Sequence, residues 1–544
     1  MKIRDNDSVR KREFLGLWFA LLFILLGFPF LRQAGMHYDA SDELGSFYRC
    51  CSPAFKVELF GRQVPLMIIS YLGAFKAWLY LPILRYLQLT PLSLRLPMLA
   101  VGACSVWLFF NLLERVSGRG AAVAGTLMLV TDATFVIATG YDFGPIAFLH
   151  LFLLAGIVLV LKFKDTGSSV YLALGFFLFG LALWHKALFI WMLVGLAAAT
   201  LAVFHRQVLA LFSIGRFLLA GLSLSIGAFP LIYYNVVTGG ATFNTASVIS
   251  GDAPFSQKAR ILRKTMDGTI FFGFLTDDSP SGIAVQPART AGRISVAVGR
   301  AAGAIRRNWM FIAFLAACTM LPWLWFTRSR APAMFASVFL AVTWGQMLVL
   351  PNTGGSLHHA ILIWPFPHFL IAVSGAQLAQ RLGRRGAWVL IGTLTTLVTV
   401  NILLLNEYYA DLLTHGTTAI WTDAVYPLSS YLEGLPESNI VTTDWGYAST
   451  LCLLSDGEIR LTDISFALLQ ESRANSDAVR SLMADPGSAF VAHAQGDEMF
   501  PGVRGRLSTI ATEAGYTPQM LTVVTDRNHR PRFEIFRYVR TTLR

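Results

Sequence analysis

Long apolar stretches recur about eleven times along this chain of 544 residues, and they restrict it to very few folds. A hydrocarbon core needs about 20 apolar residues for each helical span. The chain is 55% hydrophobic and 14% charged, whereas an ordinary soluble domain carries about 25% charged residues. We therefore expect an α-helical polytopic membrane protein. The predicted spans are 14–31, 92–113, 119–138, 143–162, 169–185, 186–204, 211–234, 308–326, 331–350, 357–380 and 387–406.

Basic residues between these spans predict the orientation. The net charge is +12, but the charges are spread over short loops rather than gathered on one face, which argues against nucleic-acid binding. The loops on the side of the basic N-terminus carry Arg115, Arg119, Lys162, Lys164, Arg206, Arg328, Arg330, Arg381, Arg384 and Arg385. By the positive-inside rule, this side is cytoplasmic and the C-terminus lies outside.

Two domains are expected. Residues 1–406 would form the transmembrane domain, with external loops at 32–91 and 235–307, and residues 407–544 a soluble, periplasmic α/β domain. Residues 64–87 are apolar enough to span, but a crossing there would move every later basic loop outside. We therefore expect that segment to form interfacial helices. The tail has strand-like runs at 439–443, 489–492, 520–525 and 533–538.

The first external loop is rich in acids. Asp39, Asp42 and Glu43 follow His37 within six residues, and side chains three or four apart share one face of a helix. A carboxylate near lipid is poorly solvated when ionised, so its pKa rises, and it can accept a proton from an attacking hydroxyl. The alternative is a solvated helix start, where the helix dipole favours acids.

Asp142 is the second acidic candidate. It follows an apolar run and precedes a Gly-Pro that starts the next helix. Carboxylates near hydrocarbon are costly and often functional. The alternative is a capping residue. Asp132, within the third span, is a weaker candidate of the same kind.

Cations at the outer ends of the apolar helices run against the charge bias. A bound phosphate would explain them, because ammonium, guanidinium and imidazolium groups pair well with phosphate. The alternatives are snorkelling to lipid head groups and, for the histidine pair, a metal site. The candidates are Lys76, His185, Lys186, His358 and His359, with Arg260 and Arg263 in the second external loop. No Walker A loop, dinucleotide fingerprint or Ser–His–Asp signature is present.

These residues resemble the GT-C superfamily of membrane glycosyltransferases, in the branch of protein O-mannosyltransferases and lipid A aminoarabinose transferases (glycosyltransferase family 39-like). The likeness covers about residues 10–410 by architecture. It rests on Asp42-Glu43 after the first span, Tyr71-x-Gly-Ala-x-Lys76, Asp142 in Tyr-Asp-Phe-Gly-Pro, His358-His359 before Trp364-Pro365-Phe366-Pro367, and Asp444-Trp445-Gly446 in the soluble domain.

The resemblance implies a GT-C fold and an inverting transfer of a sugar from a polyprenyl-phosphate donor to a lipid, glycan or protein acceptor at the outer face of a bacterial inner membrane. Asp42 or Glu43 would be the general base, with Asp39 one helical turn away, and Asp142 would support the base or the acceptor. The donor would be bound by Tyr71, Lys76, His185, Lys186, His358 and His359, with Arg260 and Arg263 from the second external loop. No cofactor is required, and a divalent cation (Mg²⁺ or Mn²⁺) stays an open alternative.

Two other classes of protein compete with this interpretation. A transporter or flippase for lipid-linked glycans should show paired broken helices in related halves, and no such internal symmetry is visible. A non-catalytic assembly or sensor protein would use the tail as a binding module.

Overall fold

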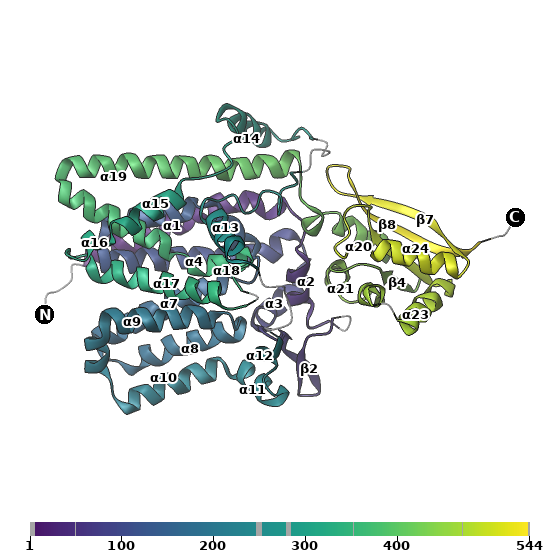
Figure 1. Ribbon diagram of the computed structural model, residues 1–544, viewed down its shortest axis with the longest axis horizontal. Helices are drawn as coiled ribbons and strands as arrows, with labels where there is room; N and C mark the ends of the chain where they lie inside the picture. Colours follow the sequence, from purple (N-terminus) through teal and green to yellow (C-terminus); the bar gives the residue numbers. More distant parts are fainter. Residues whose placement is uncertain are drawn as a thin grey trace.

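A bundle of apolar helices and a smaller α/β domain make up the molecule, and the N-terminus lies at the end of the bundle away from that domain (Figure 1). The computed structural model describes residues 6–48, 51–245, 253–278, 284–351, 353–470 and 472–541. The bundle contains α1 (Asn6–Gly27), α4 (Pro91–Ser117), α5 (Arg119–Thr131), α6 (Ala133–Tyr141), α7 (Ala147–Thr166), α8 (Ser169–His185), α9 (Phe189–Leu211), α10 (Ile214–Gly227), α11 (Phe229–Thr238), α15 (Met310–Thr319), α16 (Leu321–Leu324), α17 (Arg330–Val349) and α19 (Phe366–Thr414).

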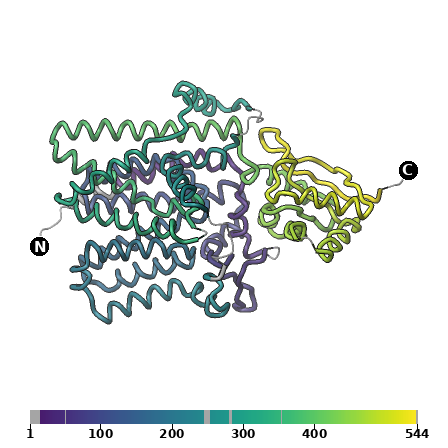
Figure 2. The backbone as a smooth tube through the Cα atoms, in the orientation of Figure 1, coloured from purple at the N-terminus to yellow at the C-terminus, as the bar shows by residue number. Residues whose placement is uncertain are grey.

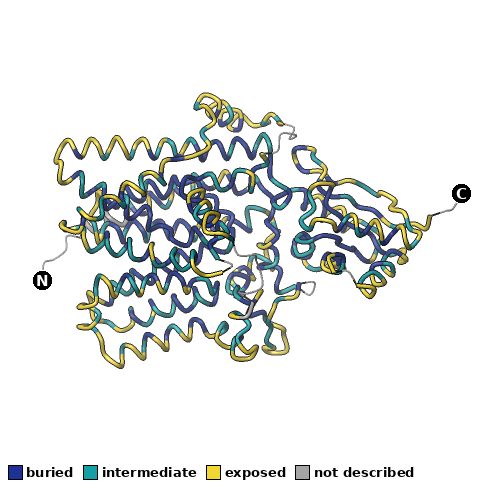
Figure 3. Tube along the Cα trace, viewed as in Figure 1, coloured by how far each residue is buried: buried dark blue, intermediate teal, exposed yellow. Residues whose placement is uncertain are grey.

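Each of the eleven predicted spans coincides with helix, so the predicted fold class is confirmed. Among the described residues, six helices are long and apolar enough to cross a membrane, or eight if each of two bent pairs is one span. Figure 3 shows that buried residues are concentrated where the helices meet, and that exposed residues lie along α10 and along the outer part of α19. These exposed faces are apolar, as a lipid-facing surface requires, with Leu218 and Leu222 on α10 and Trp388 and Ile391 on α19.

Two breaks in the helices have local causes. The pair α5–α6 bends by 61° at Asp132, whose carboxylate accepts the backbone N–H groups of Thr134 and Phe135. Asp132 therefore caps α6, as the helix-capping alternative predicts. Within α19, Gly383 has φ 61° and ψ −136°, and the chain folds back there into two arms (Figure 2). These arms are the predicted spans 357–380 and 387–406.

The first external loop forms a layer between the bundle and the α/β domain. It contains α2 (Tyr38–Gly45), an antiparallel sheet of β1 (Phe55–Leu59), β2 (Arg62–Ile69) and β3 (Leu72–Gly73), and α3 (Phe75–Tyr86). The prediction of interfacial helices over 64–87 is wrong for its first half. There the chain forms β3 and most of β2, and β2 is the second strand of a hairpin whose tight turn is made by Phe60 and Gly61, both with positive φ. The second half is helical, as predicted.

The second external loop carries short helices: α12 (Ala241–Thr245), α13 (Phe255–Met266) and α14 (Thr290–Ala301), with α18 (Leu357–Ala360) between α17 and α19. In α14, Ser295 and Asn406 of α19 exchange hydrogen bonds, which holds this helix against the outer arm of α19. The face of α14 that bears Ile294 is exposed.

The C-terminal domain is built on a five-stranded sheet in the order β5-β4-β6-β8-β7. Strands β4 (Asn439–Thr442), β5 (Leu461–Asp463) and β6 (Ser488–His493) are parallel, whereas β8 (Pro531–Arg540) runs antiparallel to β6 and to β7 (Tyr516–Thr525). The predicted strand-like runs all fall in this sheet. Its helices are α20 (Val425–Glu433), α21 (Tyr447–Leu454), α22 (Ser465–Leu469), α23 (Arg473–Ala484) and α24 (Val503–Glu513).

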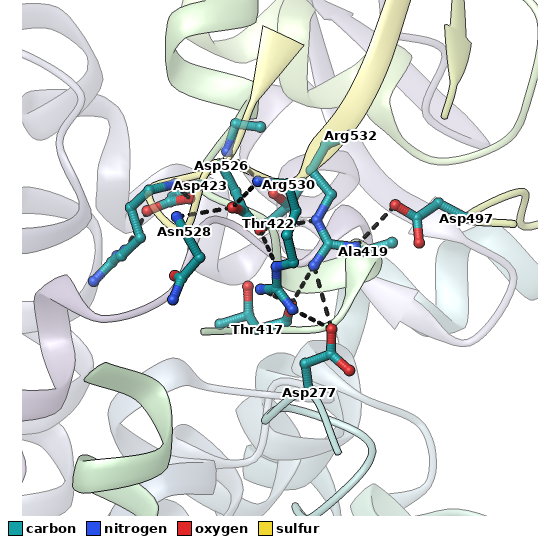
Figure 4. A network of polar contacts seen from close by, with 12 residues as sticks. Asp277, Thr417, Ala419, Thr422, Asp423, Asp497, Asp526, Asn528, Arg530 and Arg532 are labelled. Atoms are coloured by element: carbon teal, nitrogen blue, oxygen red, sulfur yellow. Dashed lines mark hydrogen bonds and ion pairs between the residues drawn. The ribbon is translucent and has the colours of Figure 1, made fainter. Parts of the chain in front are cut away.

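An ionic network fastens this domain to the bundle (Figure 4). Arg530 and Arg532, from the β7–β8 hairpin, both pair with Asp526 of that hairpin and with Asp277 of the second external loop. Both also donate to the carbonyl of Thr417, just after α19. These partly buried ion pairs and hydrogen bonds join the β7–β8 hairpin to the second external loop and to the chain just after α19.

Candidate active site

The short helix α2 presents its acidic residues in two directions. His37 caps the helix, because its Nδ1 accepts the backbone N–H of Asp39. Asp39 and Glu43 are four residues apart and therefore share one face. Asp42, on the other side of Asp39 from Glu43 around the helix, is hydrogen-bonded to Ser449 of the C-terminal domain. The structure thus separates three carboxylates that the sequence groups together.

Glu43 and Asp142 converge on one ammonium group, that of Lys76. Lys76 Nζ, at the start of α3, donates to Glu43 Oε2 at 2.9 Å and to Asp142 Oδ2 at 2.6 Å. All three side chains are at most 3% exposed. Asp142 has φ 50° at the end of α6, and its second oxygen accepts the N–H of Ala147 in α7. Asp142 therefore both caps the start of α7 and belongs to the cluster.

The charge states within this cluster differ. Burial raises the pKa of Glu43 to about 7, although Lys76 opposes the rise. Burial also disfavours ionised Asp142, but Lys76 and the Ala147 amide outweigh it and hold the pKa of Asp142 below its ordinary value. The same carboxylates raise the pKa of Lys76 above its ordinary value against the effect of its burial. Lys76 and Asp142 thus favour their charged forms, whereas burial favours the protonated form of Glu43.

Lys186 and Tyr71 border the cluster. Lys186 Nζ donates to the carbonyl of Gly144 at 2.6 Å, and the carbonyl of Tyr71 accepts the N–H of Ala187. Burial lowers the pKa of Lys186 to about 8, against the raising effect of Glu43, Asp142 and Asp39. Burial, and next the charge of Asp39, raise the pKa of Tyr71. Asp39 therefore lies within electrostatic reach of both groups, and its side chain is 55% exposed.

The three histidines that the sequence predicts as donor ligands border the other side of this cluster. His185, at the end of α8, packs its ring against Phe75 and Phe148. His358 packs on Phe143, and a Cβ added at Gly144 would come within 2.1 Å of the His358 Cβ. His359 Nδ1 accepts the N–H of Gly354.

The two loop arginines do not face this group. Arg260 and Arg263 lie on the exposed side of α13, and Arg263 Nε is 3.6 Å from Asp267 Oδ2 on the same helix. The buried cation of α13 is Lys258, which donates to the carbonyls of Leu348 and Leu350 ahead of His358. The α13 sequence does not mark Lys258, because burial there depends on how the helix packs.

A small cavity lies beside Lys76. It has a volume of about 30 Å³ and is bordered by His37, Asp142, Tyr141 and Arg95 among others. That is room for a water molecule or two. Arg95, which the sequence analysis missed, donates to the carbonyls of Leu31, Ala34 and Gly35 and so caps the end of the first span.

These features define a class of protein: a helical membrane protein with the GT-C architecture, in which an acidic first-loop helix lies between the ends of the spans and a small α/β domain. Among the described residues, no cluster of three histidine, cysteine or acidic side chains is arranged to bind a metal ion.

Comparison with solved structures supports this class. No protein-family profile and no curated protein matches the sequence. The chain is similar to ArnT from Cupriavidus metallidurans bound to undecaprenyl phosphate, with a TM-score of 0.57 and 12% identity over 95% of this chain and 97% of that one. The apo state of ArnT gives 0.55 and 13% over the same shares. An Archaeoglobus fulgidus oligosaccharyltransferase in complex with zinc and sulfate gives 0.52 and 11%, over 96% of this chain and 73% of that one. The predicted GT-C fold is confirmed.

Proposed function

We propose that this protein is a glycosyltransferase that moves a sugar from a polyprenyl-phosphate donor to an acceptor at the outer face of a bacterial inner membrane, with inversion at the anomeric carbon. The observation that carries the proposal is the buried Glu43–Lys76–Asp142 cluster, bordered by Lys186 and by the histidines at the ends of the spans. Buried ion clusters are costly to maintain and are often kept for chemistry.

The cations suit a phosphate leaving group. When the bond between C1 and the phosphate oxygen breaks, its electron pair leaves with the polyprenyl phosphate, whose negative charge grows. Preorganised cations stabilise such charge in the transition state. Lys186 would bind the donor phosphate as a cation, and the rings of His358 and His359 would donate hydrogen bonds to it. ArnT was solved with undecaprenyl phosphate, and the shared fold supports a lipid carrier of that kind here.

Asp39 is the general base that the geometry favours. A base must touch the acceptor hydroxyl, and among the three carboxylates of α2, Asp39 is the one whose side chain is 55% exposed. Glu43 is buried and paired with Lys76, and Asp42 is turned toward Ser449. The acceptor oxygen attacks C1 while Asp39 takes its proton. Glu43 and Asp142 then keep Lys76 in position, so the base lies one helical turn from the Asp42–Glu43 pair that the sequence favours.

A divalent cation fits this site poorly. The position between the Glu43 and Asp142 oxygens, where such an ion would bind, is occupied by the ammonium group of Lys76. In this proposal Lys76 supplies the positive charge.

The charge pattern supports the orientation. Arg115 and Lys164 lie in the last turns of α4 and α7, and Arg384 lies beside the bend of α19 at Gly383. Helix α1 runs from the basic N-terminal segment toward α2. The bundle end with the basic loops would be cytoplasmic, and α2 and the C-terminal domain periplasmic.

The test uses purified protein in detergent, a panel of synthetic undecaprenyl-phosphate sugars and a cell-envelope extract as the source of acceptor. We expect release of free undecaprenyl phosphate and a loss of about 10²–10⁴-fold in Asp39→Asn. Asp165→Asn, in an exposed pair at the other end of the bundle, is the matched control and should keep full activity. Binding of the donor without release in every case would favour the transporter alternative and overturn the proposal. Full activity in Asp39→Asn with loss in Asp42→Asn would move the base to Asp42.

A further inference from the structure

Helix α2 is held by one face and carries its acids on another. Tyr38, Ser41 and Asp42 are spaced by three and four residues and all contact the C-terminal domain. Asp39 and Glu43 lie about 100° further round the helix, on the face that is turned toward Lys76 and Lys186. The contacts on the first face therefore set the direction of the second.

The deepest of these contacts is a chain of buried hydrogen bonds. The Tyr38 hydroxyl lies 2.8 Å from His493 Nε2, and His493 Nδ1 lies 2.8 Å from Asp444 Oδ2. Tyr38, His493 and Asp444 are each 1% exposed. Side chains of this polarity are rarely buried so completely without a structural or chemical reason.

The sheet brings two of these residues together. Strands β4 and β6 are parallel neighbours, with Thr442 beside Val491. Asp444 and His493, each two residues further on, therefore meet at the carboxyl edge of the sheet, which faces the bundle. Gly446 has φ 111°, and a Cβ there would come within 2.0 Å of the Tyr38 ring. Only glycine leaves room for this tyrosine.

The chain has one direction. Asp444 also accepts the backbone N–H groups of Met499, Phe500 and Trp445. Burial disfavours the ionised form, but these bonds and His493 keep the pKa of Asp444 below its ordinary value. A carboxylate can only accept, so His493 Nδ1 donates to Asp444; in the neutral imidazole Nε2 then accepts from the Tyr38 hydroxyl, which also lies 3.5 Å from the carbonyl oxygen of Ala419.

We infer that Asp444, His493 and Tyr38 are positioning residues, through which the C-terminal domain fixes the rotation of α2 and aims Asp39 at the cation-lined side of the site. This inference rests on the proposed transferase function. It gives the C-terminal domain a role in catalysis without contact between that domain and the reacting atoms.

The experiment compares Tyr38→Phe and Asp444→Asn with Tyr447→Phe in the full-length protein. Tyr447 is a matched control, because its buried hydroxyl bonds only within the domain, to the Val491 carbonyl and the Thr443 amide. We expect kcat to fall by about 10- to 100-fold in Tyr38→Phe and in Asp444→Asn, as small misplacements of a catalytic group do. The donor KM should stay within about twofold of wild type, because the donor-binding cations lie on other helices. Tyr447→Phe should leave both constants unchanged.

Hydrogen exchange supplies a second readout that does not depend on activity. Amides of residues 38–45 should exchange faster in Tyr38→Phe and Asp444→Asn, and at the wild-type rate in Tyr447→Phe. Unchanged exchange and kcat in Tyr38→Phe would overturn the inference, as would equal losses in Tyr447→Phe. Faster exchange in Tyr38→Phe and Asp444→Asn, together with no sugar transfer by the wild-type protein, would instead count against the proposed function alone.

Discussion

Lys76 Nζ lies 2.9 Å from Glu43 Oε2 and 2.6 Å from Asp142 Oδ2, so one ammonium group joins the first external loop to the turn between α6 and α7. Residues 33 and 66 positions apart in the chain meet in this cluster. The cluster carries one negative charge in excess when all three groups are ionised. The energetic consequences of that imbalance can be measured.

Replacing Lys76 should cost more than replacing either carboxylate. Lys76→Met leaves two buried carboxylates unpaired and should lower the free energy of unfolding by about 3–5 kcal/mol. Combining it with Glu43→Gln and Asp142→Asn should recover most of that loss, because the site is then neutral. Thermal unfolding in detergent measures both. Asp165→Asn, in an exposed pair, should change stability by less than about 1 kcal/mol. A triple variant less stable than Lys76→Met would contradict this account.

Asp42 should make stability depend on pH. Burial raises its pKa from 3.8 to about 6, so the folded protein holds this proton more tightly than the unfolded chain. The stabilisation is complete below pH 3.8 and is lost as the pH rises through about 6. Asp42→Asn removes this loss. Its stability relative to wild type should therefore be greater at pH 7.5 than at pH 4.5, by on the order of 1 kcal/mol. The same difference in melting temperature between the two proteins at both pH values would refute the assignment.

Lys186 should set the alkaline limit of activity. Burial lowers its pKa to about 8, so the free enzyme loses this cation as the pH rises through that value. We expect kcat/KM for the donor to fall above about pH 8, with a smaller fall in kcat, because bound phosphate holds the proton. Lys186→Arg stays charged and should remove this alkaline limb, the fall of kcat/KM at high pH. A pH profile with the same alkaline limb in Lys186→Arg would assign it to another group.

Gly144 should be required for donor binding. It has φ 72°, and its Cβ position lies 2.1 Å from His358. Gly144→Ala should push His358 away from the site and raise the donor KM by about 10- to 100-fold, since a lost hydrogen bond to a charged group is worth about 1.5–3 kcal/mol. Gly61→Ala is the matched control, because Gly61 has φ 71° but nothing within 4 Å of a Cβ. It carries the same backbone strain without the collision, and its donor KM should not change.

Much of the architecture could be predicted from the sequence. Apolar runs predict helices, because within lipid the backbone N–H and C=O groups can form hydrogen bonds only with each other. All eleven predicted spans are helical, and the strand-like runs of the tail form one sheet. The orientation inferred from the basic loops also predicts that the loop acids Glu43 and Asp142 lie at the same end of the bundle. Their shared contact with Lys76 agrees with that prediction.

The sequence alone could not rank Asp39, Asp42 and Glu43, nor find the chain from Tyr38 to His493 and Asp444. Spacing along a helix says which residues share a face, but the rotation of an eight-residue helix is set by what packs against it. Here that is a domain some 400 residues further along the chain, which takes Tyr38 and Asp42. Local chemistry thus determined which groups are available, and only long-range packing decided which of them point toward the cations.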